Sequence, residues 1–173
     1  MIVYWETTLA CGLSCEHCRA MAMPGPQPGQ LTTEEGLDLL DQVAGFGDPP
    51  PHIVFTGGDP LRRPDLELLV HAATVRGIGA SLAPAVTPDL SKRRLADLKA
   101  VGIQAISLSL DGSTATRHDG LRCVPGTFDM TMEAVDWAAE LALPVQVNTL
   151  VTEQTLADLP AVYRLLTKRT LMR

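Results

Sequence analysis

The chain has 173 residues, of which 46% are hydrophobic and 20% charged, enough apolar material for the core of one globular domain. Twenty acidic and fourteen basic residues give a formal net charge of −6, the wrong sign for a protein that binds nucleic-acid backbones. No apolar run is long enough to span a membrane, and no export signal begins the chain. We therefore expect a cytoplasmic protein that binds neither nucleic acid nor membrane. In that reducing compartment, four cysteines indicate metal binding or catalysis before disulfides.

Strands and helices are predicted to alternate along the chain. Apolar and β-branched runs predict strands at residues 2–7 (short and buried), 53–55, 80–83, 105–110 and 145–151. Helical spacing of apolar residues follows each run, with helices expected to begin near Thr32, Asp65, Thr87, Thr127 and just before Leu159. Glu35 completes a capping box with Thr32, and Gly45 ends that helix. The polar segment before Thr127 is predicted to be a loop.

Five strand–helix units in this order predict an α/β fold with a parallel sheet and right-handed crossovers, either open or curled into a barrel. In such folds the loops after the carboxyl ends of the strands carry the chemistry. The unusual residues of this chain all fall in those loops. They are the cysteines after the first strand, residues 57–60 after the second and residues 111–122 after the fourth.

Three cysteines lie within eight residues, Cys11, Cys15 and Cys18, in a CxxxCxxC pattern. Such a loop can fold around one inorganic centre. A [4Fe–4S] cluster held by three thiolates keeps one iron open for another ligand. The alternative is a structural zinc site completed by His17 or Cys123. His17 adjoins Cys18, however, and the paired C-x₂-C arms typical of zinc sites are missing.

Together these motifs resemble the radical S-adenosylmethionine (SAM) superfamily. The resemblance rests on the cysteine triplet, on Gly57-Gly58-Asp59-Pro60, and on residues 107–112 with the segment 118–128 behind them. It extends over nearly the whole chain. The segment after the fourth strand resembles the branch that often carries a C-terminal SPASM or twitch extension. That branch includes peptide maturases and enzymes of haem b and haem d1 synthesis.

The resemblance implies a partial (β/α)6 barrel, like an incomplete TIM barrel, with about five strand–helix units present. It implies an enzyme with two cofactors, a [4Fe–4S] cluster and SAM. Reductive cleavage of SAM would yield a 5′-deoxyadenosyl radical, which abstracts hydrogen from a small-molecule or peptide substrate, with a tetrapyrrole among the candidates. Reduced flavodoxin or ferredoxin would donate the electron. The cofactor performs the difficult step, and the protein orients it.

Residue by residue, the resemblance implies that Cys11, Cys15 and Cys18 ligate iron. The remaining implied positions would contact SAM: Gly57, Gly58, Asp59, Pro60, Ser109, Arg122, His17 and Asn148. The glycines would bring backbone carbonyls close to the cofactor's ammonium group.

Several of these positions have ordinary structural alternatives. The segment 57–60 can be a simple turn. Asp59 stands where the family more often has Glu, one methylene longer. Ser109 and Arg122 suit a carboxylate, but also fit a strand-end hydroxyl and a solvated arginine. His17 can stack near the adenine, Asn148 can be a satisfied strand polar group, and Cys123 can be inert or touch substrate.

We also expect residues 1–173 to be an incomplete radical SAM core. No sixth strand–helix unit and no cysteine-rich C-terminal extension can be found. Two alternatives to an active enzyme follow: a zinc-stabilised α/β binding module, and an inactive truncated remnant. The fold does not determine the substrate.

Overall fold

Five strands form one parallel sheet in the computed structural model, which describes residues 1–18 and 21–171. The strands are β1 (Ile2–Glu6), β2 (His52–Thr56), β3 (Ala80–Leu82), β4 (Ile103–Ser109) and β5 (Val145–Asn148). Each strand pairs with the one before it in the chain, giving the order β1-β2-β3-β4-β5. The strand order never reverses, as it does in open doubly wound sheets, so the sheet has the topology of part of a barrel.

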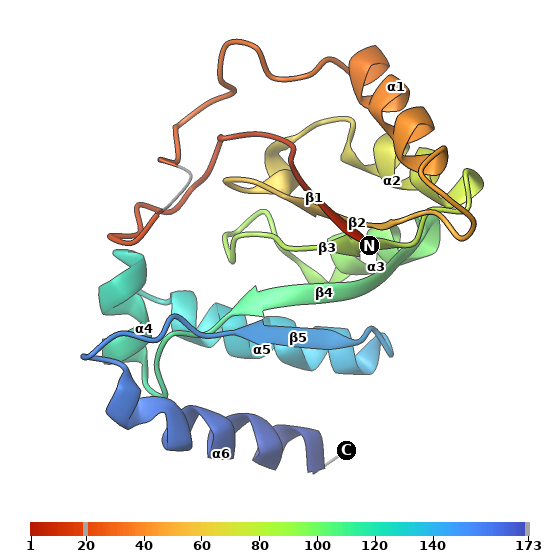
Figure 1. Ribbon diagram of the computed structural model, residues 1–173. Coiled ribbons are helices and arrows are strands. Elements are labelled where there is room, and N and C mark those ends of the chain that lie inside the picture. Colours follow the sequence, from red (N-terminus) through yellow and green to blue (C-terminus); the bar gives the residue numbers. More distant parts are fainter. Residues whose placement is uncertain (19–20, 172–173) are drawn as a thin grey trace.

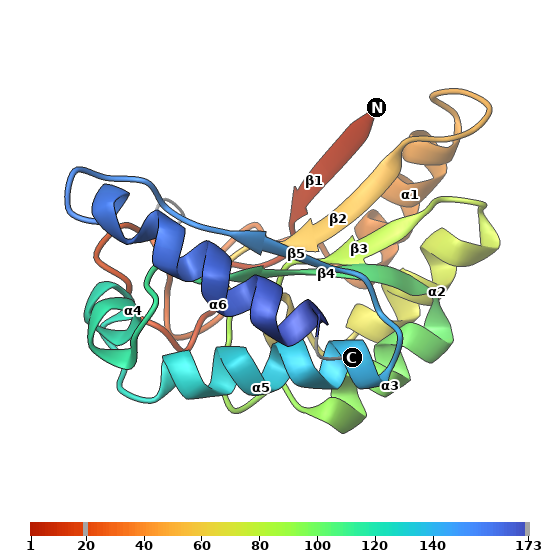
Figure 2. The same cartoon turned by 90° about the horizontal axis from the view of Figure 1, so that it is seen from below.

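Helices cover one face of this sheet (Figures 1 and 2). The helices of the described residues are α1 (Thr33–Ala44), α2 (Leu66–Val75), α3 (Lys92–Val101), α4 (Ala115–Arg122), α5 (Thr127–Glu140) and α6 (Leu159–Leu171), with short 3₁₀ turns at Pro60–Arg62 and Leu156–Asp158. Figure 2 shows α1, α2, α3 and α5 under the sheet. No helix of the described residues covers the opposite face. In Figure 1, α4 and the segment before α1 lie beyond the carboxyl ends of the strands.

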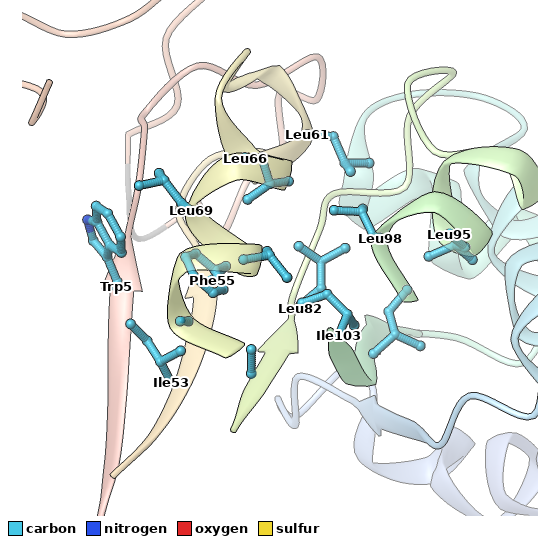
Figure 3. Packing of buried hydrophobic residues seen from close by; sticks show 14 of the residues in the cluster. Trp5, Ile53, Phe55, Leu61, Leu66, Leu69, Leu82, Leu95, Leu98 and Ile103 are labelled. Carbon is cyan, nitrogen blue, oxygen red and sulfur yellow. The ribbon is translucent and has the colours of Figure 1, made fainter. Parts of the chain in front are cut away.

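The hydrophobic core lies between the sheet and its helices (Figure 3). Phe55 of β2 and Leu82 of β3 are fully buried, as are Leu69 of α2 and Leu98 of α3. The ring of Trp5 lies 5.7 Å from that of Phe55. Each such side chain contributes roughly 1.5–3 kcal/mol by leaving water. The core therefore fixes the strand ends that position the loops.

Most side chains on the opposite face of the sheet are polar or at least partly exposed, with Val54 a buried exception. Strand side chains alternate between the two faces, so Ser107 and Ser109 point away from the core that Ile106 and Leu108 fill. The first strand follows the same rule. Tyr4 is 67% exposed, which corrects the prediction that this strand is buried. The apolar composition of β1 predicts a strand, but it does not show which face of that strand the helices cover.

Helix boundaries follow local capping chemistry, with some corrections to the sequence-based prediction. The Thr32–Glu35 capping box and the Gly45 end of α1 are confirmed. By contrast, α3 begins after Ser91, whose hydroxyl accepts from the Arg94 N–H, and not near Thr87.

The segment predicted to be a loop before Thr127 contains a helix, α4. Its sequence has no apolar stripe, and His118 is its single buried residue, so hydrophobic periodicity gave no signal. The next helix is preceded by Gly126, with a φ of 86°, and Thr127 is the first residue inside it. The predicted N-cap at Thr127 is therefore displaced by one position.

Candidate functional site

The loop after β1 closes on itself and carries the three clustered cysteines. The Cys11 N–H donates to the Met23 carbonyl at 2.9 Å, and the Met23 N–H donates to the Leu9 carbonyl at 2.9 Å. Ala10 and Met23 thus form an isolated bridge. The cysteines therefore project from one closed loop at the carboxyl edge of the sheet.

Each of the three sulfur atoms has its own hydrogen-bond donor. Cys11 Sγ accepts from the Leu13 N–H at 3.4 Å, and Cys18 Sγ accepts from the Ala22 N–H at 3.4 Å. Cys15 Sγ accepts from Arg122 Nη1 at 3.8 Å. Burial raises the pKa of the Cys11 thiol, while the Leu13 N–H acts in the opposite direction. N–H donors at sulfur favour the thiolates that metal binding requires.

A cavity of about 310 Å³ opens beside these thiols. It brings together nearly all the residues predicted for the site: Cys11, Cys15, Cys18, His17, Gly57, Gly58, Ser109, Arg122 and Asn148. These residues come from the loops after β1 and β2, from β4 and β5, and from the end of α4. The site is thus at the edge of the sheet where the sequence analysis expects it.

Gly57 and Gly58 allow the loops after β1 and β2 to touch through their backbones. A Cβ on Gly57, whose φ is 137°, would lie 2.3 Å from the Thr8 carbonyl oxygen. One on Gly58 would lie 2.6 Å from the oxygens of Leu9 and Ala10. The Gly58 N–H donates to Thr8 O at 2.7 Å. In this structure the glycines are therefore required to hold the cysteine loop against the second strand.

Asp59 and Pro60 do not line the cavity. The Asp59 side chain is fully buried, and its carboxylate accepts from the Leu61 N–H at 3.1 Å and from the Thr87 hydroxyl at 3.0 Å. Burial raises its pKa to about 6 despite these donors. Pro60 begins the following 3₁₀ turn and is buried as well. The structure places both behind the cavity wall, where Asp59 joins the loops after β2 and β3.

Arg122 is fixed at the cavity wall by a buried carboxylate. Its Nη2 lies 2.5 Å from Oδ2 of Asp111, and the Asp111 side chain is 2% exposed. His17 Nε2 lies 3.8 Å from the same oxygen. Two buried atoms, Arg122 Nε and His17 Nδ1, have no hydrogen-bond partner among the described residues. The Arg122 Nε–H is a buried donor without a partner among the described residues, so an acceptor in the cavity could satisfy it.

The wall formed by β4 and β5 is polar. Asn148 Nδ2 donates to Ser107 Oγ at 2.9 Å, and both residues line the cavity beside Ser109. Glu6 and Thr56, at the facing ends of β1 and β2, line it too. Sequence reasoning missed Glu6, Thr56 and Ser107, although strand alternation placed Ser107 on the same side as Ser109. Asp111 was also missed as the partner of Arg122.

The remaining polar residues of the region have structural partners. His118 is buried, and its Nδ1 accepts from the Asp111 N–H at 3.0 Å. Burial, followed by the charge of Arg122, lowers the pKa of His118 to about 4. Asp119 accepts from the N–H groups of Gly126, just before α5, and of Phe128 in its first turn. Cys123 is exposed, has a φ of 57° and lies outside the cavity lining.

All four cysteines are free thiols. In the part of the chain that the structure describes, no three His, Cys, Asp or Glu side chains converge on a point that could hold one metal ion. The same part of the chain has no helix long and apolar enough to cross a bilayer.

The chain is similar in sequence to a known family and to several curated proteins. The family model described as "Radical SAM superfamily" matches residues 5–166. The AdoMet-dependent heme synthase of Nitratidesulfovibrio vulgaris is 36% identical over 167 residues, covering 95% of this chain and 44% of that protein. The mycofactocin maturase MftC of Mycobacterium tuberculosis is 32% identical over 160 residues, covering 90% of this chain and 39% of that protein. The chain thus spans less than half the length of these curated relatives.

A solved structure described as native anSMEcpe with bound AdoMet superimposes with a TM-score of 0.78 at 19% identity. The match covers 98% of this chain and 48% of that one. It confirms the predicted partial barrel. Because the family model spans most of the residues described above, the chain belongs to the radical SAM superfamily.

Proposed function

We propose that residues 1–173 form the cofactor-binding part of a radical SAM enzyme, with Cys11, Cys15 and Cys18 as ligands of a [4Fe–4S] cluster. The observation that carries this proposal is the meeting of these three thiols with Gly57, Gly58 and a fixed arginine around one cavity. A cluster held by these three cysteines would keep one iron open for a further ligand, here SAM.

The chemistry of the donor set favours a cluster over a zinc ion. Three cysteines in one CxxxCxxC loop would leave one cluster iron open. Zinc sites usually show paired C-x₂-C arms, which this sequence lacks. Each sulfur also has a separate donor, and hydrogen bonds to sulfur stabilise cluster ligation.

The other cavity residues would hold SAM in place. Arg122 and Ser109 offer a cation and a hydroxyl to its carboxylate, and Gly57 and Gly58 present backbone without side-chain bulk. His17 and Asn148 complete the lining as groups for the adenosine portion. When bound, the reduced cluster supplies the electron that cleaves SAM and so generates the radical that removes hydrogen from substrate. The protein positions the reactants and limits water access.

The substrate class is proposed from the relatives. The similar proteins are described as heme synthases, an Fe-coproporphyrin III synthase, a peptide cyclase and a mycofactocin maturase. We therefore propose a tetrapyrrole or a peptide as substrate, and reduced flavodoxin or ferredoxin as the electron donor. Because the chain covers less than half of these relatives, residues 1–173 would contribute cofactor chemistry and only part of the substrate contacts.

Anaerobic reconstitution with iron and sulfide tests the proposal. The wild-type chain should bind about four irons and show the broad visible absorption of a cluster. Under dithionite it should convert SAM to 5′-deoxyadenosine and methionine, which chromatography measures. Cys15→Ala should lose both the iron and the cleavage.

Cys123→Ala is the matched control, because Cys123 is an exposed thiol outside the cavity lining. Its iron content and cleavage should equal those of the wild type. Stoichiometric zinc, with no cluster absorption after reconstitution, would support the zinc-stabilised binding module instead. A four-iron chain that never cleaves SAM would identify an inactive remnant.

A further inference from the structure

Arg122 contacts one cysteine of the triplet directly. Its Nη1 lies 3.8 Å from Cys15 Sγ, while Leu13 and Ala22 supply backbone N–H donors to the other two sulfurs. Cys15 is therefore distinguished by a charged donor, whose positive charge is partly offset by the Asp111 carboxylate on Nη2. The Arg122 side chain is 15% exposed, so water screens this charge only weakly.

The orientation of this guanidinium is set by Asp111. The carboxylate binds Nη2 through Oδ2 at 2.5 Å, and its Oδ1 accepts from the Leu150 N–H at 2.8 Å. The Asp111 N–H is held in turn by His118 Nδ1. The carboxylate is thus fixed by the segment after β5 and by α4, and it turns the other arm of the arginine fork toward Cys15. Arg122 Nε stays without a partner among the described residues.

A cation beside a cluster ligand acts on the electron that enters the cluster. Reduction is a one-electron step, [4Fe–4S]²⁺ + e⁻ → [4Fe–4S]⁺, and it adds negative charge to the irons and to the ligand sulfurs. A nearby positive charge and an N–H···S hydrogen bond stabilise the reduced form more than the oxidised form. Their effect is to raise the reduction potential.

We infer that Arg122, oriented by Asp111, is a positioning residue that raises the reduction potential of a cluster held at Cys15. This inference rests on the proposed function. It adds a role to the SAM contact, since it acts before SAM is present. A more easily reduced cluster accepts its electron from a milder donor.

The test is a redox titration of the reconstituted chain without SAM, with dithionite as reductant and the EPR signal of the reduced cluster as readout. Arg122→Gln removes the positive charge, leaves the Asp111 carboxylate without its cation, and keeps a polar side chain. We expect a more negative midpoint potential, with the ratio of reduced to oxidised cluster falling about tenfold at a fixed solution potential. Because SAM is omitted, loss of the proposed contact between Arg122 and the SAM carboxylate contributes nothing to this shift.

Arg117→Gln is the matched control on the same helix. Arg117 is half-exposed, lies near Asp158 at 3.7 Å and does not line the cavity. The same change of charge there should leave the potential unchanged. An unshifted potential in Arg122→Gln, or equal shifts in both variants, would overturn the inference.

Arg122→Lys covers the case in which the glutamine variant fails to retain its cluster. The compact ammonium keeps the charge but cannot span the Asp111 carboxylate and the Cys15 sulfur together. Its potential should lie below that of the wild type, and a wild-type value with four irons bound contradicts the inferred geometry. A wild-type chain that binds no iron defeats the proposed function itself. Iron binding and SAM cleavage with unshifted potentials defeat the inference alone.

Discussion

The Asp59 carboxylate accepts a hydrogen bond from the Thr87 hydroxyl at 3.0 Å, and this buried contact joins the loops after β2 and β3 behind the cavity wall. The loop after β2 contributes Gly57 and Gly58 to the cavity, and the loop after β3 contributes Pro84. Asp59 thereby affects the shape of a site that its own side chain does not reach.

Asp59→Asn should change the stability of the metal-free chain in a pH-dependent way. Relative to the wild type, the variant should be more stable at neutral pH than at acidic pH. Burial raises the folded-state pKa of Asp59 from 3.8 to about 6. Its protonated form therefore favours folding below about pH 4, and this contribution is lost as the pH rises to 6. The full effect is at most about 3 kcal/mol. Urea unfolding at pH 4.5 and 7.5 should show the variant gaining on the wild type with rising pH. A pH-independent difference would contradict this.

His118 should have the opposite pH dependence. Its folded-state pKa is lowered from 6.5 to about 4, mainly by burial, so the folded chain holds the neutral ring. Its contribution to stability is present above about pH 6.5 and is lost as the pH falls toward 4, by up to about 3 kcal/mol. In His118→Asn the side-chain oxygen can still accept from the Asp111 N–H. The variant should lose less stability than the wild type between pH 7 and 4.5, measured by the same unfolding experiment. A parallel loss in both chains would exclude His118 as the source.

Gly58→Ala should destabilise the fold and disturb the cysteine loop. The added methyl group would lie 2.6 Å from the Leu9 and Ala10 carbonyl oxygens, which accept from the Met23 and Asp59 N–H groups. Overpacking of this kind costs roughly 2 kcal/mol or more. Thermal unfolding measures the loss, and iron content after reconstitution should fall because Cys11 follows the displaced segment.

Gly120→Ala is its control. A Cβ at Gly120 in α4 would meet nothing within 4 Å. Alanine favours a helix interior over glycine by about 0.5–1 kcal/mol, so this variant should be slightly more stable and should keep its iron. Equal losses in the two variants would show that the loop contact at Gly58 is unimportant.

The strands and the place of the site follow from local sequence patterns. Short apolar and β-branched runs mark most of the strands, β3 (Ala-Ser-Leu) the least clearly. Thr32 with Glu35 marks the start of α1 through a cap that forms within four residues. Parallel strands put all their carboxyl ends at one edge. The cysteine loop, the glycine pair and Arg122 could therefore be expected to lie together from the order of the strands alone.

The features that the sequence did not predict depend on partners that are distant in the chain. Thr87 looks like a helix cap in sequence, and its hydroxyl does accept from the Asp89 N–H at 3.3 Å, but it also donates to Asp59 and forms only a turn, and the helix begins after Ser91. The α4 helix lacks an apolar stripe, and its one buried residue, His118, receives a hydrogen bond from Asp111. Such pairings depend on which loops the sheet brings side by side. Residue patterns report the type of element, and they do not report these partners.

Asp119 provides the last prediction, because it holds α4 to the start of α5. Its carboxylate accepts from the N–H groups of Gly126 and Phe128, each at 2.7 Å, and from the Thr127 hydroxyl at 2.8 Å. Asp119 therefore caps α5 in place of the N-cap residue Gly126, which has no side chain. Asp119→Ala leaves these donors to water and should cost about 1–2 kcal/mol in thermal or urea unfolding.

Asp119→Asn retains one oxygen acceptor, so it should lose less stability than the alanine variant. The three donors surround the carboxylate at the first turn of α5, which also favours a negative charge there. Since Asp119 lies outside the cavity lining, both variants should still bind about four irons at temperatures where they are folded. A loss of iron without a loss of stability would instead place Asp119 in the site, because a helix cap can affect the site only by changing the stability of its helix.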